Sequence, residues 1–250
     1  GSPAPRHRAA PVAVPEPEPA APEGESQSTS DAPRLMDVII DRLVGAGPPA
    51  RQVWLPPLAE APSLDALLPS IVPDERAGGR TASQALLDAG HERIGHITLT
   101  PGIPATLGRL DGLRDAMHGA GLALDETLVE PSDGTADGGY DAAMRLLDHP
   151  HPPTAIFCGN DRVAMGAYDA IKERGLRIPE DISVVGFDDQ EILAGYLRPG
   201  LTTVALPFEE MGAAGVSMLA SLAAGETIAD PQVEIACPLR SRSSIGMRRR

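Results

Sequence analysis

The sequence is poor in aromatic residues, in cysteine and in basic side chains. Aromatic residues make up 3% of the 250 residues, so a core must be aliphatic, which suits parallel strands buried on both faces. The two cysteines, Cys158 and Cys237, lack CxxC spacing, which argues against a metal site and is typical of reduced thiols in a cytosolic protein. The 35 acidic side chains outnumber the 21 basic ones. This balance argues against a chain that wraps nucleic acid by itself.

Other absences exclude a membrane protein and the common hydrolases. No apolar run approaches the length of a membrane-spanning helix, and the first residues do not form a signal peptide. The motifs GxSxG, GxxxxGK[ST] and HExxH are missing, and the histidines show no metal-ligand spacing. We therefore expect a cytoplasmic protein that is not an enzyme and that needs neither a metal nor a cofactor.

Residues 154–204 have the pattern strand, helix, strand. An apolar run at 154–157 precedes Val163, Ala167 and Ile171 at helical spacing, and a second apolar run follows at 182–185. Polar clusters at 159–161 and 186–189 come directly after the two runs. In open α/β sheets ligands bind beyond the carboxyl ends of the strands, so both clusters should face one site.

Strands alternate with helices along most of the chain, which predicts parallel β/α units. Residues 1–34 are rich in Pro, Ala and Glu and predict a disordered tail. A helix at 34–47 and a short strand at 52–55 should follow it. From residue 70 onward the expected features are a strand at 71–72, a turn at Gly78-Gly79, a strand at 94–99, a helix at 108–121, strands at 128–130 and 233–236, and a helix at 208–224 whose methionine-bearing stripe forms core.

The motifs of the central stretch resemble the effector-binding domain of the lactose-repressor (LacI/GalR) family. The matching segments are GND, MGA, IPEDISVVGFDD and LTTV, in this order and spacing. The likeness runs from about Ile71 to Ile245. It implies an α/β, two-lobed periplasmic-binding-protein-like type I fold with parallel sheets. The family's helix-turn-helix headpiece and first strand–helix units have no counterpart here, so the N-terminal lobe is expected to be incomplete.

The resemblance also implies a division of the chain. Residues 35–73 and 205–230 would form the partial N-terminal lobe, and residues 74–204 and 231–246 the C-terminal lobe. A small polar effector, a sugar or a related metabolite, would bind between the lobes. Partners would be a second copy in a homodimer and operator DNA, the latter only through a headpiece absent from this chain.

Four residues match positions that bind effector in the family: Arg109, Asn160, Asp188 and Phe208. Arg109 offers five fixed donors to vicinal oxygens, and Asn160 both donates and accepts. Asp188 accepts charge-assisted hydrogen bonds from hydroxyl groups, and the neighbouring Asp189 should hold the loop. Each residue also has a structural alternative. Arg109 could be an exposed helix arginine, and Asn160 could be the N-cap of the helix that starts near Asp161. Asp188 could belong to a turn, and Phe208 could pack between the lobes.

The sequence departs from the sugar-binding pattern at Pro56 and Gly134, where members of the family often have an aspartate and an aromatic residue. The leading hypothesis is the effector-sensing domain of a LacI/GalR-type regulator. The alternatives are a periplasmic-type sugar-binding protein and a fragment that binds nothing.

Overall fold

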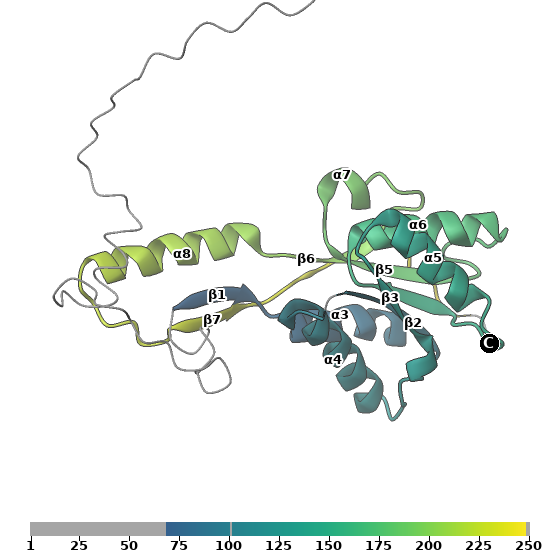
Figure 1. Ribbon diagram of the computed structural model, residues 1–250, viewed down its shortest axis with the longest axis horizontal. Coiled ribbons are helices and arrows are strands. Elements are labelled where there is room, and N and C mark those ends of the chain that lie inside the picture. Colours follow the sequence, from purple (N-terminus) through teal and green to yellow (C-terminus); the bar gives the residue numbers. More distant parts are fainter. Residues whose placement is uncertain (1–68, 101, 249–250) are drawn as a thin grey trace, which may run out of the picture.

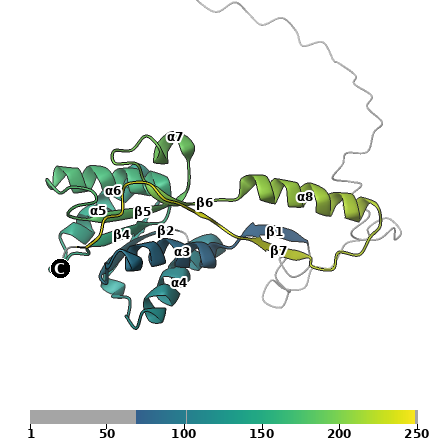
Figure 2. The ribbon, with the colours of Figure 1, turned by 180° about the vertical axis from the view of Figure 1, so that it is seen from behind.

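The computed structural model describes residues 69–100 and 102–248. The main sheet has six strands in the order β3-β2-β4-β5-β6-β8, and Figures 1 and 2 show it from two sides with the helices packed around it. Neighbouring strands are parallel except for the antiparallel pair β6 and β8. The expected α/β fold with parallel strands is confirmed. The strands are β2 (Ile94–Leu99), β3 (Val129–Ser132), β4 (Ala155–Cys158), β5 (Ser183–Asp188), β6 (Thr202–Ala205) and β8 (Leu239–Arg240).

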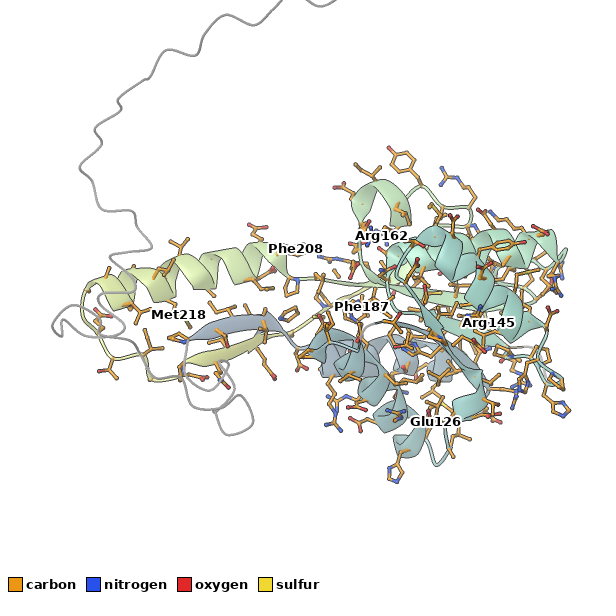
Figure 3. All side chains as sticks on the ribbon, viewed as in Figure 1. Glu126, Arg145, Arg162, Phe187, Phe208 and Met218 are labelled. Carbon is orange, nitrogen blue, oxygen red and sulfur yellow. The ribbon has the colours of Figure 1, made fainter. Side chains whose placement is uncertain are left out.

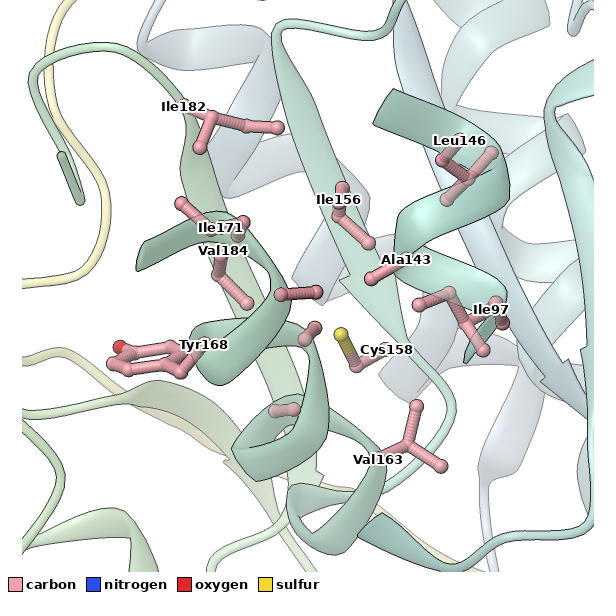
Figure 4. Close-up of a cluster of buried hydrophobic side chains, with 14 of the residues drawn as sticks. Ile97, Ala143, Leu146, Ile156, Cys158, Val163, Tyr168, Ile171, Ile182 and Val184 are labelled. Carbon is pink, nitrogen blue, oxygen red and sulfur yellow. The ribbon is translucent and has the colours of Figure 1, made fainter. Parts of the chain in front are cut away.

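Helices cover both faces of this sheet, as the near-continuous apolar strands require. Along β4, Ile156 and Cys158 enter the core shared with one helix pair, and Ala155 and Phe157 enter the core on the opposite face. Figure 4 shows the first of these cores. The helices are α3 (Glu75–Asp88) and α4 (Pro104–Gly119) on one face, α5 (Ala136–Leu147) and α6 (Asp161–Glu173) on the other, with the short η1 (Glu126–Leu128) and α7 (Glu191–Ala194) in connections.

Glycines bring the helices of each pair into backbone contact. A Cβ on Gly166 of α6 would overlap the Ala136 carbonyl oxygen of α5, and one on Gly139 of α5 would overlap the Val163 carbonyl oxygen of α6. Gly79 of α3 has the same relation to the Arg109 backbone of α4. Any side chain at these positions must push the helices apart.

The remaining strands, β1 (Ser70–Pro73) and β7 (Gln232–Ile235), form a separate parallel pair. They lie with α8 (Phe208–Ala223) apart from the six-stranded sheet (Figure 1). The apolar stripe of α8, including Met211 and Met218, is only half-buried, and α8 has no buried residue. The expectation that this stripe is core is therefore wrong within the described residues, where the helix packs on a sheet of two strands.

Other expectations need correction or lie outside the described residues. Gly78 and Gly79 are inside α3 and form no turn; they are glycines because the Phe187 ring and the Arg109 backbone occupy the space that a side chain would need. Residues 232–235 pair with β1, although 231–246 was assigned to the C-terminal lobe. The tail at 1–34, the helix at 34–47 and the strand at 52–55 lie outside the described residues.

We expect the exchange Gly166→Ala to lower the free energy of unfolding by about 1–3 kcal/mol or more, because overpacking a tight contact forces backbone shifts. Urea unfolding measures this effect. The matched control is Gly119→Ala at the end of α4, where a Cβ meets nothing within 4 Å. There the free energy should stay the same or rise by up to about 1 kcal/mol. Equal effects of the two exchanges would contradict the close packing of α5 and α6.

Candidate functional site

The carboxyl ends of β4 and β5 and the second turn of α4 bring three of the expected site residues together. Asn160 follows β4, Asp188 ends β5, and Arg109 projects from α4. Arg109 was expected to open a helix. It lies further inside α4 because that helix begins at Pro104, and proline is favoured at the first helical position.

The Arg109 guanidinium is buried and faces protein oxygen atoms on several sides. Its Nε and Nη2 donate to the two Glu75 carboxylate oxygens at 2.7 and 3.1 Å. Nη1 donates to the Gly159 carbonyl oxygen at 2.5 Å and lies 3.4 Å from Asp188 Oδ1. The guanidinium carbon is 3.9 Å from the centroid of the Phe187 ring. Arg109 therefore joins α3, the end of β4 and the end of β5.

Asp188 has a strained backbone and an incompletely compensated carboxylate. Its φ is 107°, and that of Asp189 is 53°. Non-glycine residues with positive φ are uncommon, and such strain is concentrated at functional sites. Burial raises the pKa of Asp188, and the positive charge of Arg109 only partly opposes this effect. The Asp188 side chain retains 18% of its accessible surface, so a bound molecule could still reach it.

The structure shows the capping role that the sequence left open as the alternative for Asn160. Asn160 is the N-cap of α6, since its Oδ1 accepts from the Val163 amide at 2.8 Å, while its Nδ2 donates to the Gly134 carbonyl oxygen at 3.2 Å. Asp161, the first residue of α6, is fully buried against β6 and the residue that precedes α7. Both ends of the Asn160 side chain thus contact protein. Its role in ligand binding stays a prediction.

Phe208 and Asp189 lie at the margin of this group. Figure 3 places Phe208 at the end of α8 nearest the six-stranded sheet, and its side chain is 68% exposed. Asp189 accepts from Arg242 Nη2 at 2.7 Å. This ion pair agrees with the expectation that Asp189 holds the loop.

A cavity of about 650 Å³ lies beside the Arg109 network. It is lined by residues of β1, the first turns of α3 and α4, and β7. Glu75 belongs both to its wall and to the network, whereas none of the four expected site residues, Arg109, Asn160, Asp188 and Phe208, lines it. Its walls combine carboxylates, two arginines and apolar residues: Asp74, Glu75, Glu234, Arg76, Arg80, Val72, Pro73, Ile103 and Pro104.

The sequence pattern did not single out Glu75, and it placed Asp161 in the polar cluster at 159–161 without predicting its contacts. Glu75 could have been found, because Asp74-Glu75 before an apolar helical pattern is a typical helix start, but Gly78-Gly79 was interpreted as a turn. For Asp161 the only signal was its place after a strand. His91 contacts Thr154 Oγ1 and the Gly246 carbonyl oxygen, each at 3.0 Å, which is typical of a histidine with a structural role.

Neither a metal site nor a membrane segment is found in the described part of the chain. Residues 69–100 and 102–248 contain no group of three or more His, Cys, Asp or Glu side chains arranged to hold a metal ion. In the same ranges, no helix combines the length and hydropathy needed to cross a membrane.

Comparison with known proteins agrees with this geometry. The model of the periplasmic binding protein-like domain family matches residues 83–245. The ribose operon repressor of Escherichia coli (strain K12) is 39% identical over 168 residues, which are 67% of this chain and 50% of the repressor. A complex of the transcriptional regulator CelR with cellobiose has a TM-score of 0.65 at 36% identity, over 70% of this chain and 53% of that one.

A LacI family regulator from Enterococcus faecium with bound ribose also has a TM-score of 0.65, at 27% identity, over 72% of this chain and 65% of that one. The chain belongs to the periplasmic-binding-protein-like family. Within it, the chain is an effector-binding domain of the LacI regulator type, and it spans about half the length of the ribose repressor that it matches. Its relatives are repressors and not enzymes, which confirms that expectation.

The pH dependence of stability should report the buried Asp161. Burial raises its pKa from 3.8 to about 7, so the folded state holds a proton that the unfolded state releases near pH 4. The stabilising effect of this proton is complete below pH 4 and is lost as the pH rises to about 7. Relative to the variant Asp161→Asn, the wild type should lose about 4 kcal/mol between these limits, since one pKa unit is worth about 1.4 kcal/mol.

Urea unfolding of both proteins at a series of pH values measures this difference. The reverse slope, with the wild type gaining stability relative to the variant as the pH rises, would contradict the burial of this carboxyl group.

Proposed function

We propose that this domain binds a sugar or a related polyhydroxy metabolite at the edge of the sheet formed by the ends of β4 and β5. The observation that carries the proposal is the Asp188 carboxylate, whose negative charge is only partly balanced by Arg109 at 3.4 Å and which lies on a strained backbone. A carboxylate accepts hydroxyl protons in charge-assisted hydrogen bonds, which are about twice as strong as neutral ones. A molecule with adjacent hydroxyl groups satisfies this acceptor without bringing another negative charge into an acidic site.

The cavity next to this edge, which shares Glu75 with the Arg109 network but is not lined by Asp188, can hold the part of a ligand that extends beyond the Asp188 carboxylate. Its volume of about 650 Å³ falls in the range of about 300–1,000 Å³ that is typical of small-molecule sites. The apolar Ile103 and Pro104 can contact the C–H faces of a sugar ring, and Glu75 can accept hydroxyl groups. The cellobiose complex and the ribose-bound structure of two related regulators support the same class of ligand.

The proposed consequence of binding is regulation of transcription. A ligand with different affinities for two relative positions of the domain's parts shifts the equilibrium between them. In a full-length cytoplasmic regulator, this shift would change the affinity of a homodimer for operator DNA through a headpiece outside this chain. The acidic composition of this chain, with a net charge of −14, supports a sensing and not a DNA-contacting role.

A thermal-shift screen tests the proposal. The panel contains ribose, other monosaccharides, cellobiose, nucleosides and purines, each tested with the wild type and with Asp188→Ala. One class should raise the melting temperature of the wild type, because a ligand at 100 times its Kd adds about 2.7 kcal/mol to the free energy of unfolding. The variant should show little or no shift.

The matched control is Asp169→Ala, which removes an exposed carboxylate from α6 and should respond like the wild type. A cooperatively melting wild type that no sugar stabilises, or a shift that Asp188→Ala leaves intact, would contradict sugar binding at this site.

A further inference from the structure

The carboxylate of Asp161 connects its own helix, α6, to β6 and to the residue that precedes α7. It belongs to the first residue of α6 and is fully buried. Oδ1 accepts from the Thr203 hydroxyl of β6 at 2.6 Å, and Oδ2 accepts from the Gln190 amide, next to α7, at 2.7 Å. Asn160 already caps α6, so the helix itself does not need this carboxylate.

The sequence of β5 keeps a space open for the Asp161 carboxylate. Gly186 of β5 pairs with Thr203 of β6, and a Cβ on Gly186 would overlap Asp161 Oδ1. An alanine there would displace the carboxylate from both of its donors. A glycine in the middle of a strand weakens the strand, and here it permits this contact.

The Gln190 amide lies directly after the strained pair Asp188-Asp189. Asp189 is held from one side by Arg242, at 2.7 Å. The hydrogen bond from the Gln190 amide to Asp161 holds the turn from the other side. Two consecutive residues with positive φ persist only where their surroundings fix them, and these two contacts fix this turn.

We propose that Asp161 is a positioning residue that directs the Asp188 carboxylate toward Arg109 and the ligand by holding the Gln190 amide. The inference rests on the proposed function, because it treats Asp188 as the ligand's acceptor. Asp161 itself does not touch the ligand. Loss of its acceptor atoms releases the turn, so the ligand affinity falls through the orientation of Asp188.

Two variants of Asp161 and one control separate the effect of its hydrogen bond to the Gln190 amide from the effect of its negative charge. Asp161→Ala removes both acceptor oxygens. Asp161→Asn keeps one oxygen that accepts from the Gln190 amide, and its side-chain N–H can donate to the Thr203 hydroxyl oxygen. Asp169→Ala, on the exposed face of the same helix, is the control. The Kd for the sugar found in the thermal-shift screen is measured by calorimetry.

We expect Asp161→Ala to weaken binding tenfold or more, Asp161→Asn to stay within about threefold of the wild type, and Asp169→Ala to bind like the wild type. A folded Asp161→Ala variant with unchanged Kd would overturn the proposal, and so would an Asp161→Asn variant as weak as the alanine variant. The rescue by asparagine is the result that a general loss of stability would not give.

A ligand-free measurement on the wild type separates this proposal from the proposed function and does not require the alanine variant to fold. The Gln190 amide chemical shift is followed by NMR between pH 4 and 9. Since burial raises the pKa of Asp161 to about 7, the shift should titrate near pH 7 in the wild type and should not do so in Asp161→Asn. The other ionisable groups whose charges act at this position are Asp188, Asp189, Cys158 and Tyr168.

The same pH dependence of the Gln190 amide in both proteins would overturn the role of Asp161 even if the sugar binds. A titration with the expected midpoint in a protein that no sugar stabilises would leave Asp161 holding the turn and would refute only its link to a ligand.

Discussion

The buried guanidinium of Arg109 is the constraint on which the site depends. A charge that is taken out of water must be compensated, and removing one partner of a buried ion pair costs about 3–5 kcal/mol. Glu75, the Gly159 carbonyl oxygen and Asp188 supply this compensation from three different elements. Two carboxylates therefore share one cation, and Asp188, at the longer distance of 3.4 Å, keeps acceptor capacity for a ligand.

The rest of the fold makes this arrangement rigid. Both faces of the sheet are covered, and glycine contacts set the spacing of α3 with α4 and of α5 with α6. The strained turn after β5 costs about 1–3 kcal/mol for each strained residue, which a well-packed scaffold can tolerate. Asp161 and Arg242 hold this turn at its two sides. The position of the Asp188 carboxylate thus depends on contacts made by residues other than Asp188 itself.

The sequence predicted the parallel strands well because strands buried on both faces appear as short, continuous apolar runs. The run at 94–99 coincides with β2, and that at 182–185 overlaps β5. Partners of strands were harder to predict. The alternating pattern of the strand expected at 233–236 does not say which sheet it joins, and the structure pairs 232–235 with β1.

Side-chain roles were predictable only in part, because they depend on contacts between distant segments. The sequence placed Asn160 and Asp188 after neighbouring strands, and both lie there. It could not show that Glu75 would take two donors of Arg109, and it left open whether the Asn160 side chain would cap α6 or face a ligand. These outcomes depend on which group the folded chain buries, since a buried polar group takes the nearest complementary partner.

The most direct test of the central claim is to map ligand binding by NMR on the isotope-labelled chain, with ribose and cellobiose as the probes. Binding at the carboxyl edge of the sheet predicts that the largest amide shifts lie at residues 133–134, 159–161 and 188–190 and in the first turns of α3 and α4. Shifts confined to other parts of the chain, or none with either sugar at millimolar concentration, would contradict a sugar site organised by Arg109 and Asp188.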